Sequence, residues 1–202
     1  EYGIGTDKRN YLVMEYLKGS GLHAMIYDRD SILEGKRLEL IRQFAQALGA
    51  VHDAGFIHRD VCPRNFIAAP DCSSLKLIDF GLTLPDEPPF HQPGNRTGTP
   101  FYMAPEIVRR RKTDKRVDIF AMGVSFYQLL TFELPWPSTD ASGLAALSHD
   151  TLEPTPILEY KPKLHPKLAE AIMVCMSVNP NDRPTSTGKF LQMISGVESV
   201  TV

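Results

Sequence analysis

Two short stretches of the chain carry side chains that together suit phosphoryl transfer. Asp60 and Asn65 lie in the stretch H-R-D-V-C-P-R-N at 58–65, and Asp79 follows Asn65 by fourteen residues. A phosphoryl group in transfer spreads its charge over several oxygens, so catalysis consists mainly of holding metal ions and aligning a hydroxyl. One aspartate beside that hydroxyl, with an asparagine and a second aspartate on Mg²⁺, meets both needs. The spacing predicts such a site if the two stretches converge.

The elements predicted around these stretches would make them converge. Residues 66–68 and 75–78 are apolar runs on either side of a Pro-Asp turn, which predicts a β-hairpin with Asn65 and Asp79 side by side. Upstream, apolar residues recur at the helical period from 36 to 53 and predict a helix that ends at a glycine.

The rest of the chain predicts a mainly helical domain. Residues 81–103 are rich in proline and glycine and predict a long loop, whereas residues 117–130 are apolar on nearly every side and predict a buried helix. Residues 11–17 are apolar and aromatic and predict a strand. Weaker helical patterns cover 141–149, 166–176 and 187–195. The fold class expected is α+β, mainly α.

Composition argues against several kinds of partner. A length of 202 residues fits one domain or one lobe of a larger one, and the net charge of −2 gives no reason to expect nucleic acid or an anionic membrane. No apolar run is long enough to span a membrane. The basic run at 109–112 is interpreted as a solvated helix end, with an acidic docking patch as the alternative. Three cysteines without C-x-x-C spacing indicate a reducing compartment, so a cytoplasmic location is expected.

Three motifs in order resemble those of protein kinases. H-R-D-x-x-x-x-N at 58–65, D-F-G at 79–81 and A-P-E at 104–106 are similar to the signature of eukaryotic-like (Hanks-type) serine/threonine kinases, most of all the bacterial members. The resemblance covers nearly the whole chain. It implies a protein-kinase-like fold, with residues 1–19 as a remnant of the small lobe and hinge. The small-lobe strand at 11–17 would have lost its sheet partners. Residues 20–202 would be the helical C-terminal catalytic lobe with short β-hairpins.

The resemblance also implies cofactors, partners and residue roles. The cofactors are ATP and Mg²⁺, and the partner is a protein substrate with Ser or Thr. Asp60 would orient the substrate hydroxyl and accept its proton, Asn65 and Asp79 would bind Mg²⁺, and Thr99 would hydrogen-bond near Asp60. The residues expected at the adenine pocket are Met14, Glu15, Leu17 and Ile67. The residues expected to support the site are His58, Arg59, Phe80, Gly81, Glu106, Asp118 and Arg183.

Some of these supports have specific expected roles. His58 and Phe80 would stack in a buried spine, and Gly81, like Gly98, would supply backbone freedom. Arg59 is the residue with which the family binds a phosphorylated activation loop. Thr97 is the better candidate for such a phosphosite here, and the alternative is that the loop has no phosphosite.

One position departs from the pattern of serine/threonine kinases. Cys62 stands where those kinases usually have a lysine that neutralises the γ-phosphate, and a thiol cannot replace a fixed cation. Arg64 resembles the tyrosine-kinase arrangement, in which an arginine reaches the same region, and is expected to supply the charge. The peptide-positioning segment 98–106 resembles the serine/threonine form, so that specificity is favoured over tyrosine.

Several parts of an active kinase are missing from the chain. No Gly-rich phosphate loop, V-A-I-K lysine or partner glutamate on a preceding helix is present, and Gly3-Ile4-Gly5 lies too close to Met14 to serve. The chain begins at Glu1 rather than Met, which predicts a segment of a longer product. The hypothesis is a serine/threonine kinase catalytic lobe that is inactive alone. The alternative is a non-catalytic, pseudokinase-like binding or scaffold module.

Overall fold

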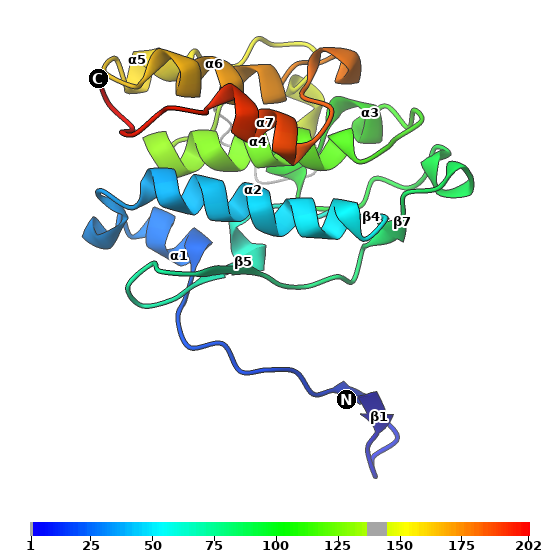
Figure 1. Ribbon diagram of the computed structural model, residues 1–202. Coiled ribbons are helices and arrows are strands. Elements are labelled where there is room, and N and C mark those ends of the chain that lie inside the picture. The colour runs from blue at the N-terminus through cyan, green and yellow to red at the C-terminus, as the bar shows by residue number, and fades with distance from the viewer. Residues whose placement is uncertain (1, 137–144) are drawn as a thin grey trace.

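Two long helices, α2 (Arg37–Asp53) and α4 (Arg116–Thr131), form the centre of the protein (Figure 1). The structure is a computed structural model that describes residues 2–136 and 145–202. α4 is buried on nearly every side, as its sequence predicts. α2 buries one face and is followed by Gly55 in the left-handed region, at φ +82°, which confirms that a glycine ends this helix.

The remaining elements are short. The other helices are α1 (Leu22–Tyr27), α3 (Pro105–Val108), α5 (Ile157–Tyr160), α6 (Pro166–Cys175) and α7 (Thr187–Met193). The strands are β1 (Tyr2–Ile4), β2 (Asn10–Leu12), β3 (Ser20–Gly21), β4 (Phe56–Ile57), β5 (Phe66–Ala68), β6 (Leu75–Leu77) and β7 (Leu84–Pro85). The mainly helical character is therefore confirmed, and α6 and α7 lie where the helical pattern predicts them.

Four phenylalanines connect the β layer to the helices. Phe66 of β5 stacks on Phe44 of α2 with ring centroids 3.6 Å apart, and Phe44 meets Phe126 of α4 edge-on at 5.1 Å. Phe126 in turn contacts Phe190 of α7 at 5.2 Å. All four side chains are fully buried, and rings in such contact stabilise a core beyond the area they bury. These ring contacts fix the distance between the β5–β6 hairpin and α2.

The predicted hairpin is confirmed and holds the two stretches in register. β5 and β6 are antiparallel, with Phe66 opposite Leu77, and β3 adds a third strand on the far side of β5. The Ile78 N–H donates to the Asn65 carbonyl oxygen at 2.8 Å, so pairing continues past the ends of the strands. β4 and β7 pair next to the sheet, one directly before the 58–65 stretch and one after Asp79.

The N-terminal strand predicted over 11–17 is wrong in extent and in its partners. β2 ends at Leu12, and it is not unpaired, because Tyr2 of β1 lies opposite Leu12 in an antiparallel hairpin. A tight turn closes this hairpin, with Gly5 N–H donating to the Arg9 carbonyl at 2.8 Å. Because β1 contributes three residues, only three pairs form. The hairpin stands apart from the helical body in Figure 1.

Two further expectations can be compared with the described residues. The helical pattern at 141–149 lies partly outside them, and its described part, Ala145–Ser148, is a 3₁₀ helix. The loop predicted over 81–103 is irregular apart from β7 and two 3₁₀ turns. Within 2–136 and 145–202, none of the helices combines the length and apolarity needed to cross a bilayer.

Candidate active site

The first turn of α4 fixes the backbone at the start of the 58–65 stretch. The Asp118 carboxylate is buried and accepts hydrogen bonds from the backbone N–H groups of His58 and Arg59, each at 2.8 Å. Arg59 has a left-handed backbone with φ 68°, which costs free energy for a residue with a Cβ. Two charge-assisted bonds from one rigid helix offset that cost and fix the direction in which the chain approaches Asp60.

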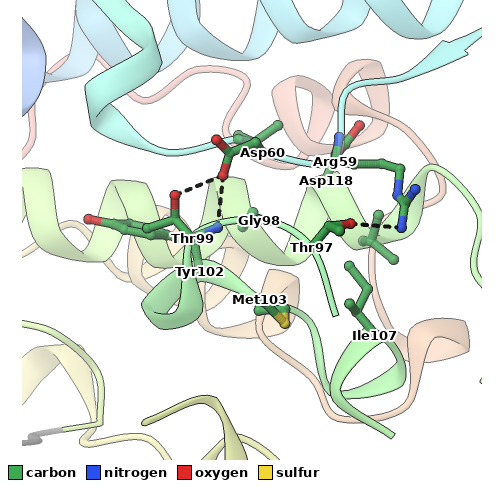
Figure 2. A pocket seen from close by; sticks show the side chains of 12 residues that line it. Arg59, Asp60, Thr97, Gly98, Thr99, Tyr102, Met103, Ile107 and Asp118 are labelled. Atoms are coloured by element: carbon green, nitrogen blue, oxygen red, sulfur yellow. Dashed lines mark hydrogen bonds between the residues drawn. The ribbon is translucent and has the colours of Figure 1, made fainter. Parts of the chain in front are cut away.

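The Asp60 carboxylate binds the loop that precedes α3. Its Oδ1 atom accepts hydrogen bonds from both the backbone N–H and the hydroxyl of Thr99, each at 2.8 Å (Figure 2). The neighbouring Gly98 has φ +116°, and a Cβ there would lie 2.9 Å from the Arg59 carbonyl oxygen. Only glycine allows the two backbones to come this close. The structure therefore brings together two predicted catalytic residues that are 39 positions apart.

Arg64 and Cys62 both contact the Thr99 hydroxyl. Arg64 Nη2 donates to Thr99 Oγ1 at 3.0 Å, and the Cys62 sulfur lies 3.7 Å from the same oxygen. Arg64 is exposed and permanently charged, whereas Cys62 is fully buried, and burial raises the pKa of its thiol. At neutral pH the only fixed positive charge that these two positions provide is on Arg64.

The three cysteines are expected to be unreactive in the folded protein. Cys62, Cys72 and Cys175 are buried, and burial raises the pKa of each thiol, so little thiolate forms near pH 7. With a chromogenic disulfide reagent at pH 7.5, native protein should release almost no colour within minutes, and denatured protein should release three equivalents. Fast release of one equivalent from native protein would show that a thiol is accessible.

The two predicted metal ligands carry oxygen donors that suit Mg²⁺. Asn65 uses its side-chain nitrogen to donate to Asp60, to the backbone oxygen at 2.8 Å and to Oδ2 at 3.1 Å, which leaves its amide oxygen for a cation. Asp79 is exposed, and one of its carboxylate oxygens accepts from the Gly81 N–H at 3.1 Å, which leaves the other. Mg²⁺ binds to one or two such groups and completes its shell with phosphate and water, so this donor set fits.

Three of the four residues predicted for the adenine pocket line one cavity. Glu15, Leu17 and Ile67 face a cavity of about 300 Å³ between the 15–18 segment and the β5–β6 hairpin. The Glu15 carboxylate pairs with the Lys76 ammonium at 2.8 Å across this cavity. Met14 is not among the lining residues, and its side chain is 74% exposed.

His58 and Phe80 make contact, but the prediction that both are buried is wrong for Phe80. Their rings meet edge-on with centroids 5.3 Å apart; His58 is fully buried and Phe80 is 53% exposed. Phe80 lines an apolar groove of about 800 Å³ between α2 and β6, together with Phe56 and Leu77. The outer face of Phe80 is exposed because this groove is open to solvent.

The backbone role predicted for Gly81 is also wrong. Gly81 lies outside the left-handed region, and that conformation falls instead on Asp79, at φ 61°. Gly81 donates its N–H to the Asp79 carboxylate, and a Cβ on Gly81 would lie 3.2 Å from that oxygen. The constraint at 81 is therefore a close approach to the Asp79 side chain rather than a need for backbone freedom. Gly98, in contrast, has the positive φ that a glycine permits.

Glu106 and Arg183 form a buried ion pair beneath α3. The guanidinium donates to both carboxylate oxygens, at 2.7 and 2.9 Å, and the two side chains are 6% and 0% exposed. Arg183 also donates to the carbonyl oxygens of Ser177, Val178 and Arg116, at 2.8–3.1 Å. α3, which follows the Thr99 loop, is thereby attached to the start of α4 and to the segment before α7.

Arg59 contacts the residue considered as a phosphosite. Its Nη2 atom donates to the Thr97 hydroxyl at 3.2 Å, and both side chains lie beside Gly98 in Figure 2. The loop residue Thr97 therefore lies within reach of a cation that could also bind a phosphate.

One contributor to the site was missed by the sequence analysis. His52, in the last turn of α2, lies 2.9 Å from Asp118 through Nε2, with both side chains almost fully buried. Asp118 can only accept, so Nε2 carries the hydrogen. The sequence contains a pattern that indicates this residue: His52 follows Leu48 by one helical turn, which places it on the apolar face of α2. A histidine on a buried face needs a partner.

Comparison with known proteins agrees with this geometry. Residues 2–194 match the family described as the protein kinase domain. The chain is 34% identical to the serine/threonine-protein kinase pkn3 of Myxococcus xanthus, over 98% of the chain and 38% of that protein. It is 35% identical to Pkn1 of the same organism, over 92% of the chain and 27% of that protein. With PknA of Mycobacterium tuberculosis the identity is 30%, over 96% of the chain and 44% of that protein.

The chain thus spans less than half the length of these curated relatives. The kinase-domain match runs through both motif-bearing stretches and on to α7, so it includes every element that positions Asp60. On this evidence the chain belongs to the protein kinase family, and it is similar to the Hanks-type serine/threonine kinases of bacteria.

Proposed function

We propose that this chain is the catalytic lobe of a serine/threonine protein kinase and transfers the γ-phosphoryl group of ATP to protein hydroxyls. The observation that carries the proposal is the constellation around Asp60. Thr99 donates to Oδ1 of Asp60, and the Asn65 amide donates to Oδ2 at 3.1 Å. Arg64 donates to the Thr99 hydroxyl at 3.0 Å. A base, a cation and two oxygen donors for metal thus lie at the end of one hairpin.

Each group has a separate task in this proposal. Asp60 is oriented by Thr99 and Asn65, so that the remaining lone pairs of Oδ2 can accept the proton of a serine or threonine hydroxyl. Arg64 offsets negative charge on the transferred group. Asn65 and Asp79 would hold Mg²⁺, which when bound neutralises phosphate charge and orients the phosphates. Thr99 positions the substrate backbone beside Asp60.

We expect negligible phosphotransfer by the 202-residue chain alone. It carries the catalytic aspartate and the metal donors but no Gly-rich loop and no lysine of the V-A-I-K type, so half of the contacts that clamp ATP phosphates are missing. Incorporation of label from γ-labelled ATP into a generic protein substrate, with Mg²⁺, measures this directly. Turnover by the chain alone that disappears in Asp60→Asn would contradict the expectation.

A further inference from the structure

Four exposed basic side chains gather at the end of α3. Arg110, Arg111 and Lys112 follow α3 after its C-cap residue Arg109, and all three are exposed. Arg96 joins them from the preceding loop, because its Nε atom donates to the carbonyl oxygen of Val108, the last residue of α3, at 2.7 Å. We refer to Arg96, Arg110, Arg111 and Lys112 as the basic face.

The neighbouring acidic groups are already paired with other cations. Asp150 accepts two hydrogen bonds from Arg109, which lowers the pKa of Asp150, and the charge of Arg111 adds to this effect. Asp114 is paired with Arg116, with a nitrogen–oxygen distance of 2.7 Å. Within residues 2–136 and 145–202, no ion pair joins a carboxylate to a side chain of the basic face.

The basic face is connected to the proposed catalytic centre through α3. Thr99 bonds Asp60, and the chain then passes through one 3₁₀ turn and the four residues of α3 before it reaches the basic face. The buried pair of Glu106 and Arg183 anchors α3, so the face is attached to the same rigid segment as the Thr99 loop. Ile107 of α3 lines the same small cavity as Asp60, so a protein substrate bound at Asp60 would extend toward this segment.

We propose that the basic face binds acidic side chains that flank the phosphorylated Ser or Thr of the protein substrate. This inference rests on the proposed function, which it narrows to an acidic class of substrate. Guanidinium groups recognise carboxylates with paired hydrogen bonds, and three of the four cations are arginines. A peptide fits better than a polyanion, because the basic face is one small region of a chain whose net charge is −2.

The test measures binding of two labelled peptides to the 202-residue chain without nucleotide. One peptide has a central serine with three glutamates on each side, and the other has glutamines in their place. By fluorescence anisotropy in 50 mM salt, the glutamate peptide should bind about tenfold more tightly, since three surface ion pairs contribute roughly this much. Most of the difference should disappear in 500 mM salt.

Two sets of variants test whether the basic face causes the preference for the glutamate peptide. The triple variant Arg110→Gln, Arg111→Gln, Lys112→Gln should bind both peptides equally. The matched control removes the same charge from three exposed lysines elsewhere, Lys163, Lys167 and Lys189, and should retain the tenfold preference. Arg96 is left unchanged because its side chain also bonds α3.

Three results would overturn the inference. These are equal binding of both peptides by the unmodified chain, a preference that survives the triple variant, or binding to phosphatidylserine vesicles or single-stranded DNA without binding to the acidic peptide. Because no ATP is present, the outcome is independent of phosphotransfer. An acidic preference of this chain, together with no phosphotransfer by the chain completed by a small lobe, would reject the proposed function and leave the binding result standing.

Discussion

Replacing Arg183 by methionine should lower the free energy of unfolding by about 3–5 kcal/mol, because it leaves a buried carboxylate unpaired. The Glu106 side chain is 6% exposed and receives two hydrogen bonds from Arg183. The substitution also leaves three backbone carbonyl oxygens without this donor, and it removes a cation 4.9 Å from the centre of the Phe120 ring. Urea denaturation followed by circular dichroism measures the change.

The control is the exposed pair of Arg109 and Asp150. Arg109→Gln removes an equally well-formed bidentate interaction at the surface, where such pairs contribute at most about 1 kcal/mol. The double variant Glu106→Leu, Arg183→Met should recover part of the lost stability, because no buried charge remains. A loss below about 1 kcal/mol for Arg183→Met would contradict the expected cost of leaving the buried Glu106 carboxylate without its partner.

Replacing Arg64 by alanine should lower kcat for phosphotransfer about 100-fold in a protein completed by a small lobe, because it removes a preorganised charge beside the transferred group. Cys62 cannot compensate, since its thiol is buried with a raised pKa. Arg64→Lys should retain more activity than Arg64→Ala, because it keeps the charge without the planar fork. Initial rates at saturating ATP and substrate measure the effect.

The position of Cys62 offers a rescue experiment. Its sulfur points to the same Thr99 oxygen as Arg64 does, at 3.7 Å, so a lysine side chain that starts at 62 could reach the same region. The double variant Cys62→Lys, Arg64→Ala should therefore regain roughly tenfold of the lost rate, as one restored charge contact allows. An unchanged rate in Arg64→Ala would show that Arg64 is not the phosphate-facing cation.

Much of the fold could be predicted because it depends on local periodicity. α2 and α4 are long enough for the 3.6-residue pattern to be clear, and the β5–β6 hairpin has a distinct turn between two apolar runs. α1 has only six residues, too few for a pattern, and was not predicted. β2 was predicted too long, because its extent is set by the three residues of its partner β1.

The site was predictable to the extent that its residues are close in sequence. Asp60, Asn65 and Asp79 were identified from spacing within one hairpin. The contact between His52 and Asp118 joins residues 66 positions apart, and no local pattern specifies it. The exposure of Phe80 likewise depends on what packs over α2 and β6, which spacing within the D-F-G motif cannot specify.

The most direct test of the central claim is phosphotransfer by this chain joined to the small lobe of its 34%-identical relative pkn3, with and without Asp60→Asn. The joined protein should transfer labelled phosphate from ATP to serine and threonine residues in the presence of Mg²⁺. Asp60→Asn should lower kcat at least about 1,000-fold with the protein still folded, since it removes the proton acceptor and alters the hydrogen bonds to Thr99. Equal turnover by the joined protein and its Asp60→Asn variant would contradict the assignment of this chain as the catalytic lobe.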